Sequence, residues 1–177
     1  MLIKTLILEG TTPRSWGEQH GEAYRAEIRE LYQIRLALTL EKTAMSSEQD
    51  VLALAAAHMP LLEQFDSQIA DEIRGLAAAS DLSEAHVVLV NHYTDIRDID
   101  RHPPPETEDP GGCSAFYVPA SSGPVLGQTW DMHASATDFV TLIQLPSVPE
   151  GSDEAGKVLL FSLTGCVGMT GLTSWGM

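Results

Sequence analysis

The chain has 177 residues, of which 44% are hydrophobic, and a formal net charge of −15 at pH 7. Its length and apolar content suit a single folded domain with a hydrophobic core. The chain has no basic cluster, which excludes a nucleic-acid footprint, and an anionic membrane surface would repel it. No stretch reaches the roughly 18 apolar residues that span a bilayer.

The first ten residues contain a short apolar run that ends at Leu8. This run is too short for a secretory signal, and no small-residue cleavage site follows it. We therefore expect a buried first strand, and we expect the protein to be cytoplasmic.

Helical signals fill residues 13–96. Thr12 before Pro13 is typical of an N-cap followed by proline at the first helical position. Apolar residues then recur at helical spacing as far as Leu38, with charged residues between them.

Serines mark the starts of two later helical segments. Ser47 opens one segment, which Pro60 should break or kink. Ser83 caps the last segment, Glu84 to about Ile96, whose first turn carries acidic side chains that favour the helix dipole.

A loop and a change of pattern follow the helices. Residues 98–112 are polar, proline-rich and without periodicity, which predicts an exposed loop. Short β-type runs come next, the first two joined by a turn at residues 121–124. These runs are 113–118, 125–130, 139–145, 158–163 and 166–172.

Helices followed by antiparallel hairpins predict the α+β class. We divide the chain into a helical region, residues 1–112, which includes the first strand and the loop, and the start of an antiparallel sheet, residues 113–177. The last residues, Trp175 to Met177, carry no polar tail and no helix stop signal. We therefore expect a sheet interrupted midway, in a partial chain.

The junction between loop and sheet has a chemistry of its own. The thiol of Cys113 can attack the upstream carbonyl of Gly112, and hydrolysis of the resulting ester frees an α-amine. Such an amine titrates near ~8 and can serve as general base for its own thiol. Glycine at positions 111 and 112 admits the strained backbone that this attack requires. The simpler interpretation is an ordinary buried strand cysteine.

Four motifs support the first interpretation when taken together. The runs are Gly17–Gly21 (Gly-Glu-Gln-His-Gly), Gly112–Phe116 (Gly-Cys-Ser-Ala-Phe), Gly127–Asp131 (Gly-Gln-Thr-Trp-Asp) and Gly165–Gly176, in which glycine recurs. Their order and spacing resemble the acyl-coenzyme A:6-aminopenicillanic acid acyltransferase (isopenicillin N acyltransferase)-like family of N-terminal-nucleophile cysteine hydrolases. That family has a Gly-Cys-[Ser/Thr] cleavage site followed by a Gly-Gln-Asn-Trp-Asp strand.

The resemblance implies an αββα sandwich, seen here as a partial chain, and cleavage between Gly112 and Cys113. Cys113 would be the nucleophile, and Asp131 the acidic residue near the new amine or the substrate. We assign substrate contacts to Tyr117, Thr129 and Trp130. The two pieces would stay together as a heterodimer, so the obligatory partner would be the protein's own second chain.

The implied function is that of an autoprocessing cysteine amidohydrolase or acyltransferase, which forms an acyl-enzyme on Cys113. Its substrate would be a small acylated amine, an amino acid derivative or a β-lactam-type amide, with acyl-coenzyme A as a candidate donor. This mechanism requires no metal and no organic cofactor.

The chain departs from the family pattern at three places. Thr129 and Thr173 stand where the family has asparagine, and Asn91–Asp95 replaces an Asn-x-Arg-[Ser/Thr]-Glu motif. These departures bear on specificity more than on the type of reaction. The family's oxyanion-hole asparagine is expected beyond residue 177.

Other constellations lead to different hypotheses. A cluster before the prolines could bind a divalent metal, although a solvated acidic face explains it better. His133 could act as a papain-like base for Cys113. Cys166 is expected in a core strand. The candidate metal-binding cluster before the prolines consists of His92, Asp95, Asp98, Asp100 and His102.

The remaining histidines and the whole chain also have simpler interpretations. His20, His58 and His86 lie in helical patterns, where we expect partly buried or surface positions. The non-enzymatic alternative for the chain is an acidic helical interaction domain, or an inactive truncated homologue.

Overall fold

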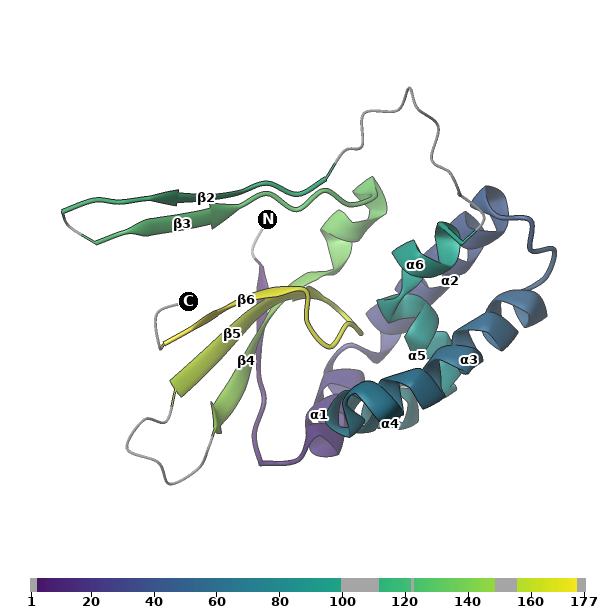
Figure 1. Cartoon of the computed structure of the whole chain (residues 1–177). Coiled ribbons are helices and arrows are strands. Elements are labelled where there is room, and N and C mark those ends of the chain that lie inside the picture. Colours follow the sequence, from purple (N-terminus) through teal and green to yellow (C-terminus); the bar gives the residue numbers. More distant parts are fainter. Residues whose placement is uncertain (1–2, 100–111, 122, 149–155, 175–177) are drawn as a thin grey trace.

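The fold combines a group of helices, a four-stranded sheet and a separate two-stranded hairpin, as seen in a computed structural model (Figure 1). The structure describes residues 3–99, 112–121, 123–148 and 156–174. The predicted α+β class is confirmed. The predicted loop falls largely on residues 100–111, outside the described ranges.

The helical region begins where the sequence predicts. Thr12 accepts a hydrogen bond from the backbone N–H of Ser15, and Ser47 accepts one from that of Asp50, so both predicted caps are confirmed. Among the described residues, no helix is long and apolar enough to cross a membrane. The helices of this region are α1 (Pro13–Ala23), α2 (Arg25–Lys42), α3 (Glu48–Phe65), α4 (Ser67–Ser80), α5 (Glu84–Asn91) and α6 (Tyr93–Arg97).

The predicted break at Pro60 does not occur, and the last predicted helix is divided in two. Helix α3 continues through Pro60, because one side of the helix, including Val51 and Ala55, packs into the core and outweighs the loss of one N–H donor. The predicted segment Glu84 to Ile96 is divided at His92, whose backbone leaves helical geometry (φ −106°, ψ 25°).

Glycines bring α1 and α4 into close contact. A Cβ atom at Gly17 would overlap the backbone carbonyl of Glu72, and one at Gly75 would overlap that of Arg14. At Gly21 an added Cβ would crowd the side chain of Ala79. The Gly17-to-Gly21 motif therefore lets two helix backbones approach each other.

The main sheet is mixed rather than purely antiparallel. Its strand order is β1-β4-β5-β6, with β1 parallel to β4 and the other pairs antiparallel. Phe139 belongs to the preceding 3-10 helix η1 (Ala134–Phe139), and the strand predicted from Cys166 starts only at Thr170. The strands are β1 (Lys4–Ile7), β4 (Val140–Val148), β5 (Gly156–Leu163) and β6 (Thr170–Thr173).

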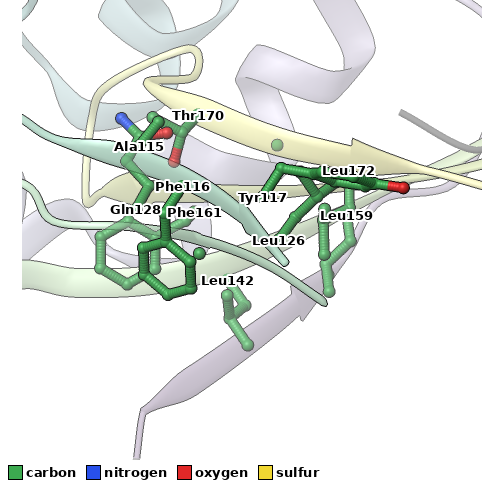
Figure 2. A pocket seen from close by; sticks show the side chains of 12 residues that line it. Ala115, Phe116, Tyr117, Leu126, Gln128, Leu142, Leu159, Phe161, Thr170 and Leu172 are labelled. Atoms are coloured by element: carbon green, nitrogen blue, oxygen red, sulfur yellow. The ribbon is translucent and has the colours of Figure 1, made fainter. Parts of the chain in front are cut away.

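The two faces of this sheet have different neighbours. On one face the Thr141 hydroxyl lies 3.1 Å from the hydroxyl of Tyr24, which joins helix α1 to α2. The alternating residues Leu142 and Phe161 face the other way, toward the hairpin (Figure 2). The prediction of a buried first strand is wrong. Within the part of the chain that the structure describes, β1 pairs along one side only, and Ile7 is 60% exposed.

The hairpin consists of β2 (Ala115–Val118) and β3 (Val125–Gln128). Ala115 lies opposite Gln128, and Val118 lies opposite Val125. The predicted hairpin is confirmed, although the strand begins two residues after Cys113. Every residue of β2 is exposed, because among the described residues the hairpin pairs with no other strand.

One turn ties the sheet to the helices. The N–H of Gly165 donates to His20 Nε2 over 2.9 Å, and the Asn91 side-chain amide donates to the Gly165 carbonyl over 2.9 Å. The N–H of Val167 donates to Asn91 Oδ1 over 3.0 Å. Both α1 and α5 thus hold the backbone that leads from β5 to β6.

His20 is fully buried, which contradicts the expected partly buried or surface position. Burial lowers the pKa of His20 to about 4, because the charged imidazolium loses its hydration. The side chain is therefore neutral, and its Nε2 accepts the Gly165 bond. Its Nδ1 has no hydrogen-bond partner among the described residues.

This buried histidine predicts a pH dependence of stability. Since its pKa is lower in the folded state than the ordinary 6.5, its neutral form stabilises the fold above pH 6.5. That stability, about 3 kcal/mol, is lost as the pH falls from 6.5 toward 4. Urea unfolding of the wild type and of His20→Gln at both ends of this pH range measures the loss in the free energy of unfolding.

The variant should be less stable at pH 7 and lose less stability on acidification. The comparison with the variant is needed because Glu72 also titrates in this range. Burial raises the pKa of Glu72 to about 7, so its protonation stabilises the folded protein over the same fall in pH. Equal losses in the two proteins would contradict a neutral, buried His20.

Candidate active site

Cys113 and Asp131 lie against each other at the open end of the hairpin. The backbone N–H of Asp131 donates to Cys113 Sγ over 3.4 Å. The N–H of Gly112 donates to the carboxylate of Asp131 over 3.3 Å. Both residues are exposed. The thiol and the carboxylate that the sequence singled out are thus brought together around the Gly112–Cys113 bond.

The register of the hairpin explains this contact. Continuing the β2–β3 pairing outward places Ser114 opposite Thr129 and Gly112 opposite Asp131. The N–H of Thr129 donates to the Ser114 carbonyl over 2.8 Å, and the N–H of Ser114 donates to Thr129 Oγ1 over 2.9 Å. Thr129 therefore holds the segment beside Cys113 and does not line either of the two cavities described below.

Gly112 has a backbone conformation that favours glycine. Its φ is +125°, a region that side chains rarely adopt, although a Cβ atom there would meet nothing within 4 Å. The requirement is therefore one of backbone conformation and not of space. The sequence argument for glycine before the cysteine gains support from this conformation.

An apolar cavity of about 540 Å³ lies between the hairpin and the main sheet (Figure 2). Hairpin side chains form one wall, among them Tyr117, which the sequence assigned to substrate contact. Sheet side chains form the other wall. The apolar side chains that line it are Ala115, Phe116, Tyr117, Leu126, Leu142, Leu159, Phe161 and Leu172.

A second cavity of about 460 Å³ shares the walls at Gln128, Phe161 and Thr170 with the first. Trp130, also assigned to substrate contact, lines this second cavity and packs edge-on against Phe161, with ring centroids 5.4 Å apart. His133 lines it as well.

The cavity walls from the main sheet were missed by sequence reasoning. From the sequence, Leu142, Leu159 and Phe161 are predicted only as strand residues. Their alternation along the strands was the one signal that they share a face of the sheet. Which strands would face the hairpin depends on contacts between distant segments.

The papain-like alternative finds no support in the hydrogen bonds. His133 Nδ1 lies 2.9 Å from the Ser135 hydroxyl and accepts from the Ser135 N–H over 3.3 Å. No hydrogen bond among the described residues joins His133 to Cys113. Residues 129–133 follow β3 outside any strand, so strand geometry does not place His133 relative to Cys113.

Cys166 is a core residue, as expected, although it lies in the turn before β6 and not in a strand. Its thiol donates to the Val90 carbonyl over 3.4 Å, and the Arg35 guanidinium donates to its sulfur over 3.7 Å. Burial raises the pKa of the Cys166 thiol, against the opposing effect of Arg35. Both cysteines are free, so the chain offers one exposed and one buried thiol.

The described ranges contain no group of three or more His, Cys, Asp or Glu side chains placed to hold a metal ion. Two members of the cluster noted before the prolines, Asp100 and His102, lie outside these ranges. The cluster as a whole therefore remains without a structural description.

Comparison with known proteins identifies no relative: no protein-family model matches the chain, and no curated protein matches it. The assignment to a family therefore stays a prediction from motifs. The geometry around Cys113 is what carries the functional proposal.

The two thiols should differ sharply in reactivity. In the folded protein iodoacetamide should label Cys113 faster than Cys166 by a factor of roughly 10³ or more. The buried thiol of Cys166 can react only in the rare molecules that have unfolded. Mass spectrometry of the digested protein measures both sites. In denaturant the two rates should converge, whereas faster labelling of Cys166 in the native state would contradict the arrangement.

Proposed function

We propose that the chain is an autoprocessing cysteine amidohydrolase or acyltransferase that is cut between Gly112 and Cys113. The observation that carries this proposal is the contact of Asp131 with both sides of that bond. Its backbone N–H meets the nucleophilic sulfur, and its carboxylate holds the N–H of the residue upstream. Such contacts restrict the thiol and the attacked peptide to one region of space.

The self-cleavage step balances without a cofactor. The Cys113 sulfur bonds to the carbonyl carbon of Gly112, and the carbon–nitrogen bond of that peptide breaks. The thiol proton passes to the released nitrogen, which becomes an α-amine. Water then hydrolyses the thioester, so that Gly112 ends in a carboxylate and Cys113 regains its thiol.

The mature N-terminus would then perform the second reaction. The α-amine of Cys113 acts as general base for its own thiol, which attacks the carbonyl of an acylated amine. The amine leaves with a proton, and an acyl-enzyme remains. Water or an acceptor amine takes the acyl group, which gives hydrolysis or transfer.

The lining of the cavities favours an amide substrate with an apolar acyl group. The larger cavity is lined mainly by aliphatic and aromatic side chains, with Gln128 on the wall that both cavities share, and the smaller one adds polar groups such as His133 and Thr137. Small acylated amines, amino acid derivatives and β-lactam-type amides meet this description, with an acyl thioester as a candidate donor.

The layers of the molecule are compatible with one half of an αββα sandwich. Helices cover one face of the main sheet, and the hairpin faces the other across the apolar cavity. We propose that the cut pieces remain associated as a heterodimer. The main sheet draws strands from both, since β1 lies before the cut and β4 after it.

An acidic helical interaction domain is the second candidate. The observation that favours it is the exposure of Leu61 (63%) and Phe65 (83%) on α3. Such a domain has no need of a cut at Cys113, so the next experiment separates the two functions.

Self-cleavage predicts a specific pair of products. Intact-mass analysis and N-terminal sequencing should find a piece that begins at Cys113, and Cys113→Ala should remain uncut. Asp131→Ala should slow cleavage by about 10- to 100-fold, because it frees the segment before the attacked bond.

Asp138→Ala provides the matched control, since this aspartate is also exposed and lies in η1 away from the junction. It should leave the cleavage rate unchanged. A folded wild-type chain that stays uncut would refute self-processing, and equal rates in the two aspartate variants would refute the role of Asp131.

A further inference from the structure

Two histidines from separate helical elements meet on the surface of the helical region. His58 belongs to α3, and His92 lies at the junction of α5 and α6. Their Nδ1 atoms are 3.0 Å apart, and the ring centroids are 5.1 Å apart. Both side chains are half-buried. The proposed cysteine chemistry makes no use of this pair.

The pair opens onto a cavity of about 380 Å³. Asp95, one turn after His92, lines the same cavity and brings a carboxylate to it. Phe65, on the rim, is 83% exposed, so the cavity communicates with solvent. Water and ions therefore have access to both imidazoles.

We propose that the Nδ1 atoms of His58 and His92 bind one divalent late transition-metal ion of the Ni²⁺ or Cu²⁺ type. Neutral imidazole nitrogen is a preferred ligand of these ions. Two nitrogens at ~2.0–2.1 Å from a metal and at right angles are about 2.9 Å apart. The two Nδ1 atoms are already 3.0 Å apart as hydrogen-bond partners, so the fold brings both imidazoles close enough to become ligands of one ion.

Binding requires only a local rearrangement. The rings at present face each other as partners in one hydrogen bond, and they must turn toward a common point in the cavity. Two protein nitrogens leave the other coordination positions to water, and the Asp95 carboxylate can accept hydrogen bonds from such water. The negative net charge of the chain favours a cation.

Such an ion would join α3 to the α5–α6 junction. Because it binds the folded arrangement and not the unfolded chain, it should raise the unfolding temperature. The proposal does not depend on the chemistry of Cys113.

Calorimetric titration of the tag-free chain with Ni²⁺ tests the site. Ni²⁺ serves as the probe because, unlike Cu²⁺, it does not oxidise the exposed thiol of Cys113. We expect one saturable site and a rise in the unfolding temperature. His58→Gln and His92→Gln should each weaken binding at least ~10-fold, since even partners outside the direct ligands typically contribute ~10–100-fold in affinity.

His133→Gln is the matched control. His133 is an exposed histidine two residues after Asp131, and it does not belong to the His58–His92 pair. It should bind Ni²⁺ like the wild type. Absence of saturable binding would overturn the proposal and leave the pair as a hydrogen bond between imidazoles. Undiminished binding in both His58→Gln and His92→Gln would overturn it equally.

Discussion

The register of the β2–β3 hairpin is the constraint on which the candidate site depends. It places Gly112 opposite Asp131 and lets the backbone of Asp131 reach the Cys113 sulfur. A slip of one residue would turn every side chain of one strand to the opposite face. The paired bonds between Ser114 and Thr129 hold this register at the open end of the hairpin.

The main sheet and the helices support the hairpin from a distance. The turn around Gly165 is held by His20 and Asn91, so the helices determine where β6 begins. The faces of β5 and β6 that point away from the helices form the wall opposite the hairpin. A helix contact thus contributes to the shape of the cavity beside the proposed nucleophile.

Local signals were sufficient for part of this structure. The caps at Thr12 and Ser47 and the hairpin follow from short segments of sequence, whereas a place for Asp131 near Cys113 was implied only by the family resemblance. Contacts between distant segments were not predictable. The burial of His20 depends on a bond to Gly165, the parallel pairing of β1 depends on β4, and His58 finds His92 on another element. The path of α3 through Pro60 likewise depends on packing.

Attack of the Cys113 thiol on the Gly112 carbonyl is the central claim, and its thioester intermediate can be trapped. The unfolded precursor should be refolded in neutral hydroxylamine, which cleaves thioesters and leaves ordinary peptide bonds intact. We expect a fragment that ends in a Gly112 hydroxamate and one that begins at Cys113, with neither formed from Cys113→Ala. A refolded chain that stays intact while its Cys113 is still alkylated by iodoacetamide would contradict the claim.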